Sequence, residues 1–440
     1  MKKISNVFLI TALILIFSYN FSYGIYETYS WTRGTDSIEA STNAITNNTN
    51  DLNIDANSNN ISINSDQSIS TNSNLEQNTS DSNSLNLESG SAILIEQSTG
   101  QIIYGKNIHE KLRPASVTKI MSILLIMEEI DSGRLSYSDK ITCSENASSM
   151  GGSQIWLDPK ESLTVDEMLK AICVVSANDC VYALSEHIAG SEEAFVQKMN
   201  DKAKELGMND TTFKNCHGID EDGHITSAYD IALMSRELLL KHPDITKYTT
   251  IWMDSLRNGK SQLVNTNKLI RTYKGITGLK TGSTSLALYN LSASATRDNL
   301  SLIAVIMKAP STKIRFAEAK KLLDYGFSKY SYKIFGKKGD IIQEVSVKKG
   351  IKSSINAVLS DNAGALIEKG KENQVTQSIE INDKIEAPIK SGDIIGKVSF
   401  AIDGKEISST NLISDSNVEK INFFTMSKKI IYKWIDLLRT

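Results

Sequence analysis

The sequence is short of several residue types, and each shortage excludes something. Its 440 residues include only five prolines and four cysteines, and 48 Lys and Arg residues nearly balance 51 Asp and Glu residues, for a net charge of −3. A charge so near zero gives no strong field of one sign, which disfavours a nucleic-acid-binding protein on charge alone. At roughly 100 to 200 residues per domain, the chain has room for two or three folded units.

One segment lacks nearly everything that a folded core needs. Residues 34–101 contain no Lys, Arg, Pro or aromatic residue, and Asn, Ser and Thr dominate residues 41–89. Such a segment cannot bury enough apolar area to offset the entropy that it would lose on ordering. We therefore expect a disordered Asn/Ser-rich spacer over residues 25–90 that carries no catalytic residue.

The N-terminus has the features of an export signal. Two lysines precede an uncharged apolar run over residues 7–17, and Ser22 and Gly24 supply small residues at the −3 and −1 positions of a signal peptidase site. The pattern predicts a signal peptide over residues 1–24 and an exported protein at the extracytoplasmic face of the cell membrane. A retained anchor is the alternative, because the apolar run reaches Phe21, but it is short for a span of about 20 residues.

Cysteine and histidine give no sign of a metal site. The four cysteines are Cys143, Cys173, Cys180 and Cys216. They allow three disulfide pairings, but none has zinc-like spacing, and His217 and His224 have no third ligand at a suitable spacing. We expect no metal or other cofactor, and we favour buried free thiols over disulfides because the cysteines lie in apolar segments or beside motifs.

Beyond the spacer, strands and helices follow one another in an order that predicts an α/β fold. Apolar runs at 92–96 and 101–104 predict a hairpin in which Gly100 turns the chain. Helices are predicted over residues 116–133, 165–175, 180–188 and 191–207. Further strands are predicted over residues 274–284, 289–296 and 301–307. Sheet, helices and sheet again indicate an α/β sandwich over residues 91–330 whose two sheet portions are far apart in sequence.

Three short motifs carry the candidate chemistry. They are Ser116-Val117-Thr118-Lys119 (SxxK), Ser176-Ala177-Asn178 (SxN) and Lys280-Thr281-Gly282 (KTG). SxxK and SxN arise by chance in a chain rich in Ser and Lys, whereas KTG seldom does. Each lies where acyl-transfer chemistry needs it: at a helix start, in a break between helices and on a strand.

The residue types and spacing indicate an activated serine. A serine hydroxyl is a weak nucleophile unless a neighbouring base removes its proton. On a helix, residues three apart share a face, so the amine of Lys119 can lie beside the hydroxyl of Ser116. A lysine is a base near neutral pH only if burial or a second cation, here Lys280, lowers its pKa. Which of the two lysines is the general base stays open.

The other motif residues are expected to bind the substrate. Ser176 and Asn178 would hold the proton network and the substrate amide. Lys280 and Thr281 would contact a substrate carboxylate, and the backbone N–H groups of Ser116 and Ser283 would stabilise an oxyanion.

In this order, the three motifs resemble those of the penicillin-binding serine acyl transferases. The surrounding segments, at residues 114–121, 149–153, 176–179, 187–191, 217–220 and 278–284, resemble the low-molecular-mass D-alanyl-D-alanine carboxypeptidases. The resemblance covers about residues 91–330 and implies a penicillin-binding/β-lactamase-like fold. It also implies a serine peptidase, acylated on Ser116, that removes the terminal D-alanine from peptidoglycan pentapeptide stems and is inhibited covalently by β-lactam antibiotics.

Family resemblance adds one residue and exposes two departures. It implies that Arg315 joins Lys280, Thr281, Gly282 and Ser283 in binding the terminal carboxylate of the substrate. Leu288 stands where relatives usually have Gly, and Cys216 stands where Pro is common, so both bear on rate and substrate range. A serine β-lactamase and a catalytically silent wall-binding scaffold are the alternatives.

The C-terminal part has a different pattern. Short alternating runs over residues 331–414 predict a small all-β domain. Residues 415–440 predict an amphipathic helix, because spacing residues at about 100° gathers the apolar side chains of residues 423–438 on one half and opposes them with Lys, Asp and Arg. Such a helix suits the surface of an anionic membrane. Docking of the helix onto the β-domain is the alternative.

Overall fold

The computed structural model describes residues 85–439. The predicted signal peptide and most of the predicted spacer lie outside these residues. Packing nevertheless begins before the expected boundary at Ser91: Leu85 and Leu87 are buried in a core cluster with α10 (Thr312–Lys329). The backbone N–H and hydroxyl of Ser89 also donate to the carboxylate of Glu318. The packed region therefore starts further toward the N-terminus than the composition suggests.

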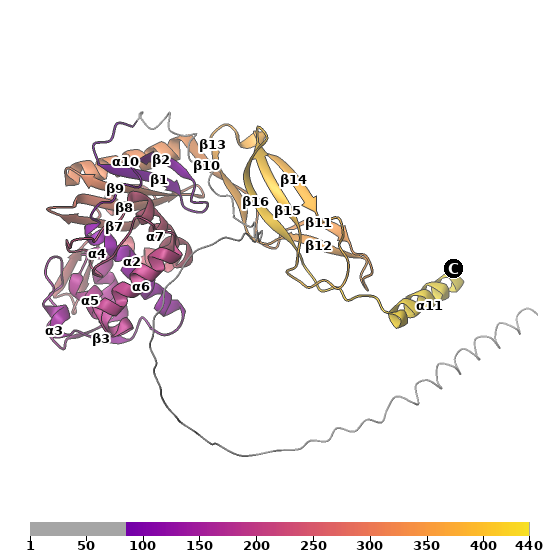
Figure 1. The fold of residues 1–440 in the computed structure, drawn as a ribbon, viewed down its shortest axis with the longest axis horizontal. Coiled ribbons are helices and arrows are strands. Elements are labelled where there is room, and N and C mark those ends of the chain that lie inside the picture. The colour runs from indigo at the N-terminus through magenta and orange to yellow at the C-terminus, as the bar shows by residue number, and fades with distance from the viewer. Residues whose placement is uncertain (1–84, 440) are drawn as a thin grey trace, which may run out of the picture. The chain divides into compact units, whose positions relative to one another are not determined.

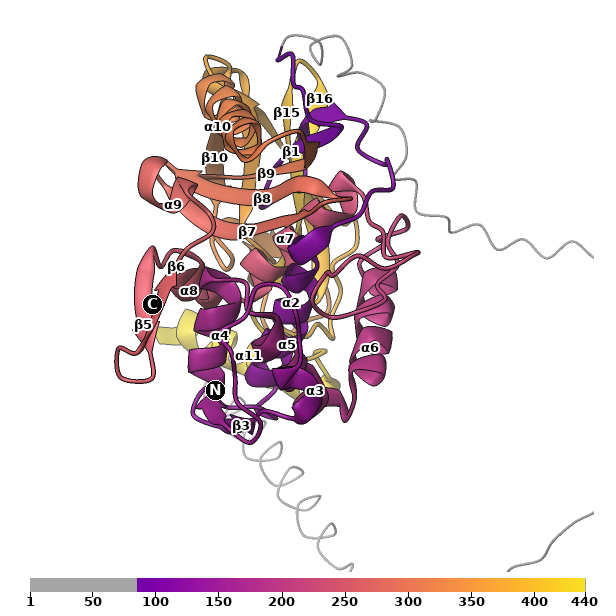
Figure 2. The same ribbon diagram turned by 90° about the vertical axis from the view of Figure 1, so that its left-hand side faces the viewer.

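A five-stranded antiparallel sheet, in the order β2-β1-β9-β8-β7, lies at the centre of the first folded part (Figures 1 and 2). Its strands are β1 (Ser91–Glu96), β2 (Ile102–Lys106), β7 (Ile276–Thr284), β8 (Leu288–Arg297) and β9 (Leu300–Ala309). The first two form the predicted hairpin, and Gly100 has a φ of +75° in its turn. Because β1 pairs with β9, the beginning and the end of this region share one sheet.

Helices cover both faces of the sheet (Figure 2). Along β9, Val305 and Met307 lie in the core shared with most of the helices, whereas Ala304 and Ile306 lie in the core shared with α10. Successive side chains of a strand point to opposite faces, so a strand buried on both sides has a nearly continuous apolar sequence. This is the α/β arrangement that the sequence predicts.

The helical layer lies between the two sheet portions in the sequence. Its α-helices are α2 (Lys119–Asp131), α3 (Glu145–Ser148), α4 (Val165–Val174), α5 (Asn178–Ala189), α6 (Glu192–Glu205), α7 (Ala228–Lys241), α8 (Thr246–Thr249) and α9 (Leu269–Thr272). Two 3₁₀ helices, η2 (Ala115–Thr118) and η3 (Pro243–Ile245), and two short hairpins, β3–β4 (Lys140–Thr142, Ser162–Thr164) and β5–β6 (Met253–Leu256, Ser261–Val264), join them.

Helix boundaries follow local capping chemistry. Thr164 and Glu167 form a reciprocal capping box at the start of α4, and the hydroxyl of Ser191 accepts the N–H of Ala194 at the start of α6. These bonds satisfy N–H groups that have no partner inside the helix. The structure refines two predicted boundaries: Ser116 lies in a 3₁₀ turn ahead of α2, and Asn178 is the first residue of α5.

The second folded part is the predicted all-β domain, followed by a helix. Its strands are β10 (Tyr330–Gly336), β11 (Ile341–Ser346), β12 (Ser354–Leu359), β13 (Ala363–Glu368), β14 (Thr376–Ile381), β15 (Ile394–Ile402) and β16 (Lys405–Ser414), with a 3₁₀ turn η4 (Glu372–Gln374). Five of them form a sheet in the order β11-β12-β16-β15-β14, and β10 pairs with β13. Helix α11 spans Phe423–Arg439, and within residues 85–439 we find no helix long and apolar enough to cross a membrane.

Candidate active site

Ser116 lies in a turn whose backbone is tightly held. The preceding residue, Ala115, has a φ of +49°, a backbone conformation that residues other than glycine seldom adopt. Two bonds keep it there: Thr118 Oγ1 donates to the Ala115 carbonyl at 2.8 Å, and Asn290 Nδ2 donates to the Pro114 carbonyl at 3.0 Å. In a 3₁₀ turn, side chains three apart eclipse one another. The turn therefore places the Lys119 side chain beside Ser116.

The amine of Lys119 has three oxygen acceptors around it. Its Nζ lies 3.1 Å from Ser116 Oγ, 2.5 Å from Asn178 Oδ1 and 2.7 Å from the carbonyl oxygen of His217. The side chain is 0% exposed. A neutral amine donates two of these bonds and keeps its lone pair for the Ser116 proton, so Lys119 has the geometry of a general base.

Electrostatics lower the proton affinity of both buried lysines. Burial lowers the pKa of Lys119 well below its usual value, and the positive charge of Lys280 lowers it further, while Cys216 and Asp179 act in the opposite direction. Burial also lowers the pKa of Lys280, to about 7, and the Arg315 guanidinium contributes. Taking an ammonium group out of water without a paired carboxylate disfavours the charged form.

The SxN motif lies at the junction of α4 and α5. Asn178 Nδ2 donates to the Gly151 carbonyl at 2.7 Å, and its backbone N–H donates to the Ser153 carbonyl at 2.7 Å. These bonds fix the side-chain oxygen that accepts from Lys119. Ser176 has a φ of +67°, and its buried hydroxyl has no hydrogen-bond partner in the part of the chain that the structure describes.

The KTG motif on β7 forms the opposite wall. A Cβ at Gly282 would lie 2.9 Å from the Ser116 nitrogen and 2.8 Å from the Pro114 oxygen, so only glycine lets β7 approach Ser116 this closely. Lys280 Nζ donates to the Thr281 carbonyl at 2.9 Å, and Thr281 Oγ1 donates to Thr266 Oγ1 at 2.7 Å. Ser283, which follows the KTG motif on β7, is exposed.

Arg315 reaches the same strand from α10. Its Nη1 donates to the carbonyls of Gly282 and Asn290, both at 3.2 Å, and the residue is only 5% exposed. Its guanidinium also lies 5.6 Å from the centre of the Tyr289 ring. Burial lowers the pKa of Arg315 to about 10, so it is a cation at neutral pH. The structure thus brings all the sequence-predicted site residues to the SxxK turn, the SxN junction, or β7 and its flank.

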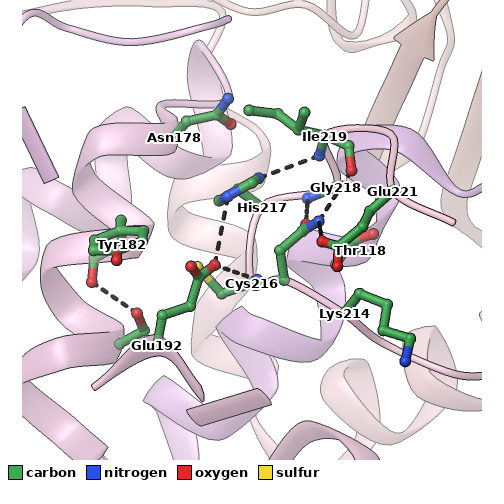
Figure 3. A network of polar contacts seen from close by, with 12 residues as sticks. Thr118, Asn178, Tyr182, Glu192, Lys214, Cys216, His217, Gly218, Ile219 and Glu221 are labelled. Carbon is green, nitrogen blue, oxygen red and sulfur yellow. Dashed lines mark hydrogen bonds and ion pairs between the residues drawn. The ribbon is translucent and has the colours of Figure 1, made fainter. Parts of the chain in front are cut away.

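Sequence reasoning missed the third partner of Lys119, the loop around His217 (Figure 3). Gly218, with a φ of +92°, packs so closely that a Cβ would lie 2.0 Å from the Ala115 oxygen. Ser122 Oγ donates to the Cys216 carbonyl at 2.6 Å, which ties the loop to α2. Residues 217–220 are among the segments that resemble the family, but no residue type signals the use of a backbone carbonyl.

The histidines and cysteines of this region support the architecture. His224 Nδ1 accepts the N–H of Lys214 at 3.0 Å, so its Nε2 carries the proton. This Nε2 contacts Thr118 Oγ1 at 2.8 Å, in the 3₁₀ turn that contains Ser116. All four cysteines are buried as free thiols. Among the described residues, no group of three or more His, Cys, Asp or Glu side chains has an arrangement suited to a metal ion.

A buried lysine within hydrogen-bond distance of a serine hydroxyl, an amide oxygen on the same amine and a second buried lysine on the facing strand define an SxxK-type serine hydrolase. The family model described as D-alanyl-D-alanine carboxypeptidase matches residues 76–311, and one described as penicillin-binding protein 5, C-terminal domain, matches residues 330–420.

Individual relatives agree with the family match. D-alanyl-D-alanine carboxypeptidase DacF of Bacillus subtilis is 45% identical over 348 residues, which are 78% of this chain and 89% of that protein. DacC of Escherichia coli, of the same description, is 32% identical over 76% of this chain and 84% of that protein. Among solved structures, penicillin-binding protein 5 from Haemophilus influenzae has a TM-score of 0.69 at 32% identity, covering 76% of this chain and 98% of that chain.

A solved structure with an antibiotic also matches: penicillin-binding protein D2 from Listeria monocytogenes in its ampicillin-bound form, with a TM-score of 0.51 and 29% identity over 55% of this chain and 99% of that chain. The chain therefore belongs to the D-alanyl-D-alanine carboxypeptidase family, and its activity is that of a serine-type D,D-carboxypeptidase. This confirms the family, fold and reaction expected from the sequence.

Proposed function

We propose that Ser116 is the residue acylated by the peptidoglycan stem peptide. Its Oγ attacks the carbonyl carbon of the penultimate D-alanine, and its proton passes to the neutral amine of Lys119. The N–H groups of Ser116 and Ser283 stabilise the oxyanion. The C–N bond then breaks, the terminal D-alanine leaves as an amine that takes a proton, and an ester to Ser116 remains. The 3.1 Å contact between Lys119 Nζ and Ser116 Oγ is the observation that carries the proposal.

Water completes the turnover by the same groups. Lys119 takes a proton from a water molecule, the resulting hydroxide attacks the ester carbonyl, and the proton returns to Ser116 Oγ as the tetrapeptide departs. Ser176 Oγ, buried and without a partner among the described residues, is positioned to pass the proton to the leaving amine. Among the described residues Lys280 makes no hydrogen bond to Ser116, and its Nζ donates to the Thr281 carbonyl, so we assign it to the substrate carboxylate, with Lys119 as the base.

We assign carboxylate recognition to β7. Lys280 and Arg315 supply positive charge, Thr281 supplies a hydroxyl, and Gly282 and Ser283 line the strand. A β-lactam carries a carboxylate and a strained amide in a comparable arrangement. The ampicillin-bound relative supports binding of β-lactams by this chain, and the adduct that we propose is an ester to Ser116.

Replacing Ser116 tests the proposal directly. In S116A, both labelling by a fluorescent penicillin and release of D-alanine from an acyl-D-Ala-D-Ala peptide are expected to vanish, and mass spectrometry of the wild-type protein should locate the adduct on Ser116. Retained release by S116A would contradict the assignment. Rapid turnover of penicillin would favour a β-lactamase, and labelling without D-alanine release would favour a silent wall-binding scaffold.

We also propose that the protein is exported and held at the membrane surface by α11. Large apolar side chains of this helix are exposed, among them Phe423 at 79%, Trp434 at 70% and Leu438 at 82%. Burial of such side chains in the headgroup region, together with the attraction of its basic residues to anionic lipid, favours attachment without spanning. The predicted signal peptide over residues 1–24 supplies the export route.

Vesicle binding tests the attachment. The chain without its signal segment is expected to co-sediment with vesicles that contain phosphatidylglycerol, less with purely zwitterionic vesicles, and not at all when residues 423–440 are removed. W434E should weaken binding without changing D-alanine release from a soluble peptide. Equal sedimentation of the truncated chain would contradict the role of α11.

A further inference from the structure

The proposed base depends on a loop that supplies no reacting side chain. One of the three oxygens around Lys119 Nζ is the backbone carbonyl of His217, at 2.7 Å. A backbone oxygen cannot be adjusted by a rotamer change, so its position is set entirely by whatever fixes the loop from Asn215 to Ile219. The groups that hold this loop therefore control the direction in which the Lys119 amine points.

Glu192, the first residue of α6, contacts this loop at Cys216 and His217 (Figure 3). Its Oε1 accepts the backbone N–H of Cys216 at 3.0 Å and lies 3.4 Å from His217 Nε2. Its side chain is 17% exposed. One carboxylate oxygen thus contacts the backbone of one loop residue and the ring of the next.

The histidine ring transmits this contact to the turn beyond it. Ile219 donates its N–H to His217 Nδ1 at 3.2 Å, so Nδ1 is an acceptor and the ring proton is on Nε2, facing Glu192. Burial lowers the pKa of His217 to about 3, and the nearby Lys119 charge contributes, which keeps the ring neutral. A neutral His217, with a hydrogen bond at Nδ1 and a 3.4 Å contact to Glu192 at Nε2, links α6 to the turn at Ile219.

We propose that Glu192 is a positioning residue for the reaction: through Cys216 N–H and the His217 ring, it fixes the carbonyl that orients the amine of Lys119 toward Ser116. This inference deepens and rests on the proposed function of Lys119. It assigns the effect to the reach of the Glu192 oxygen and not to its charge, because the charged groups that shift the pKa of Lys119 are Lys280 and Asp179.

Two substitutions separate reach from charge. E192Q keeps the length of the side chain and a carbonyl oxygen but removes the charge, whereas E192D keeps the charge and shortens the side chain by one methylene. A misplaced catalytic group costs up to roughly 100-fold in rate. We expect E192Q to acylate with a fluorescent penicillin within about 3-fold of wild type, and E192D to lose roughly 10-fold to 100-fold. In D-alanine release, E192D should lower kcat and leave KM nearly unchanged.

Glu193 provides the matched control. It is the neighbouring carboxylate in the first turn of the same helix, but it is exposed. E193Q and E193D should both keep the wild-type acylation rate, and thermal unfolding of each variant shows whether it remains folded. Equal rates for E192Q and E192D, or a slower E192Q, would overturn the positioning role. Absence of labelling in the wild-type protein would instead overturn the proposed function, so the two failures are distinguishable.

Discussion

The two folded parts of the molecule differ in what they bury. The first part buries Lys119, Lys280 and Arg315 together with several carboxylates, whereas the β-domain from Tyr330 to Ser414 buries apolar side chains and, of the polar ones, only Ser414. Its ion pairs, such as Lys397 with Glu406, are half exposed. Burying a charge is costly unless it is paired, so a buried charge without a partner needs an explanation.

The difference in buried charge between the two parts points to the region of Lys119 and Lys280 as the place of the reaction. Even in the first part, not every buried charge has the same use: Asp179 accepts the N–H groups of Ile155, Leu157 and Cys180 at 2.9 to 3.1 Å, and it thereby organises the segment beside the SxN motif. Lys119 and Lys280 have no carboxylate within ion-pair distance among the described residues. Burial without a counter-charge lowers the pKa of an amine, which is what a lysine base requires.

The largest expected effect comes from replacing one lysine in each part by methionine and comparing the two acylation rates. K119M removes the proposed base and puts an apolar side chain of similar length in the same buried position. Acylation by a fluorescent penicillin should therefore fall by about 10²-fold to 10⁴-fold. K397M removes one partner of an exposed ion pair, which is worth about 0 to 1 kcal/mol, and should leave acylation unchanged. Circular dichroism of both variants is the control for folding. A K119M protein that acylates at the wild-type rate would remove the distinction between the two parts.

The same contrast explains which part of the fold was predictable. In the first part, the Gly100 hairpin and the Ser191 cap are local signals, and they gave the correct elements. In the β-domain, the short alternating runs over residues 331–414 predicted the all-β class without bounds for its strands. Most residues of β14 are exposed, so this strand has little buried apolar surface. Strand order was beyond reach in both parts, because pairing such as that of β1 with β9 depends on contacts between distant residues.

The site divides in the same way. Side chains that react or bind, such as Ser116, Lys119 and Lys280, have types and spacings that chemistry restricts, so the sequence indicated them. The His217 carbonyl and the close approach of Gly218 to Ala115 are backbone features, and every residue has a carbonyl. No motif in the sequence singles out Glu192. Its contact with the loop depends on tertiary packing.

A smaller effect is expected from the charge of Lys280, measured as a pH dependence. Its positive charge is one cause of the low pKa of Lys119, after burial, so K280M should raise the pKa of Lys119. Only the neutral amine accepts the Ser116 proton. The acid limb of the acylation rate should therefore move to higher pH in K280M, whatever happens to the plateau through weaker carboxylate binding. The matched K397M variant should keep the wild-type limb, and a limb that stays in place or moves to lower pH in K280M would show that the two amines are not coupled.

The smallest expected effect on acylation comes from damaging the β-domain core. Phe400 is 4% exposed and stacks on Phe335 with ring centres 4.1 Å apart. F400A should destabilise this domain by about 3 to 5 kcal/mol, because it removes a buried ring and leaves a cavity. Acylation should stay within about 2-fold of wild type, since no group of this domain takes part in the proposed reaction and the residues that surround Ser116 belong to the other core. In calorimetry, the β-domain transition should move to lower temperature while the transition that a bound penicillin protects stays in place. A proportional loss of acylation in F400A would mean that the β-domain does more than fold, and that the absence of buried charge does not mark a region without a role in the reaction.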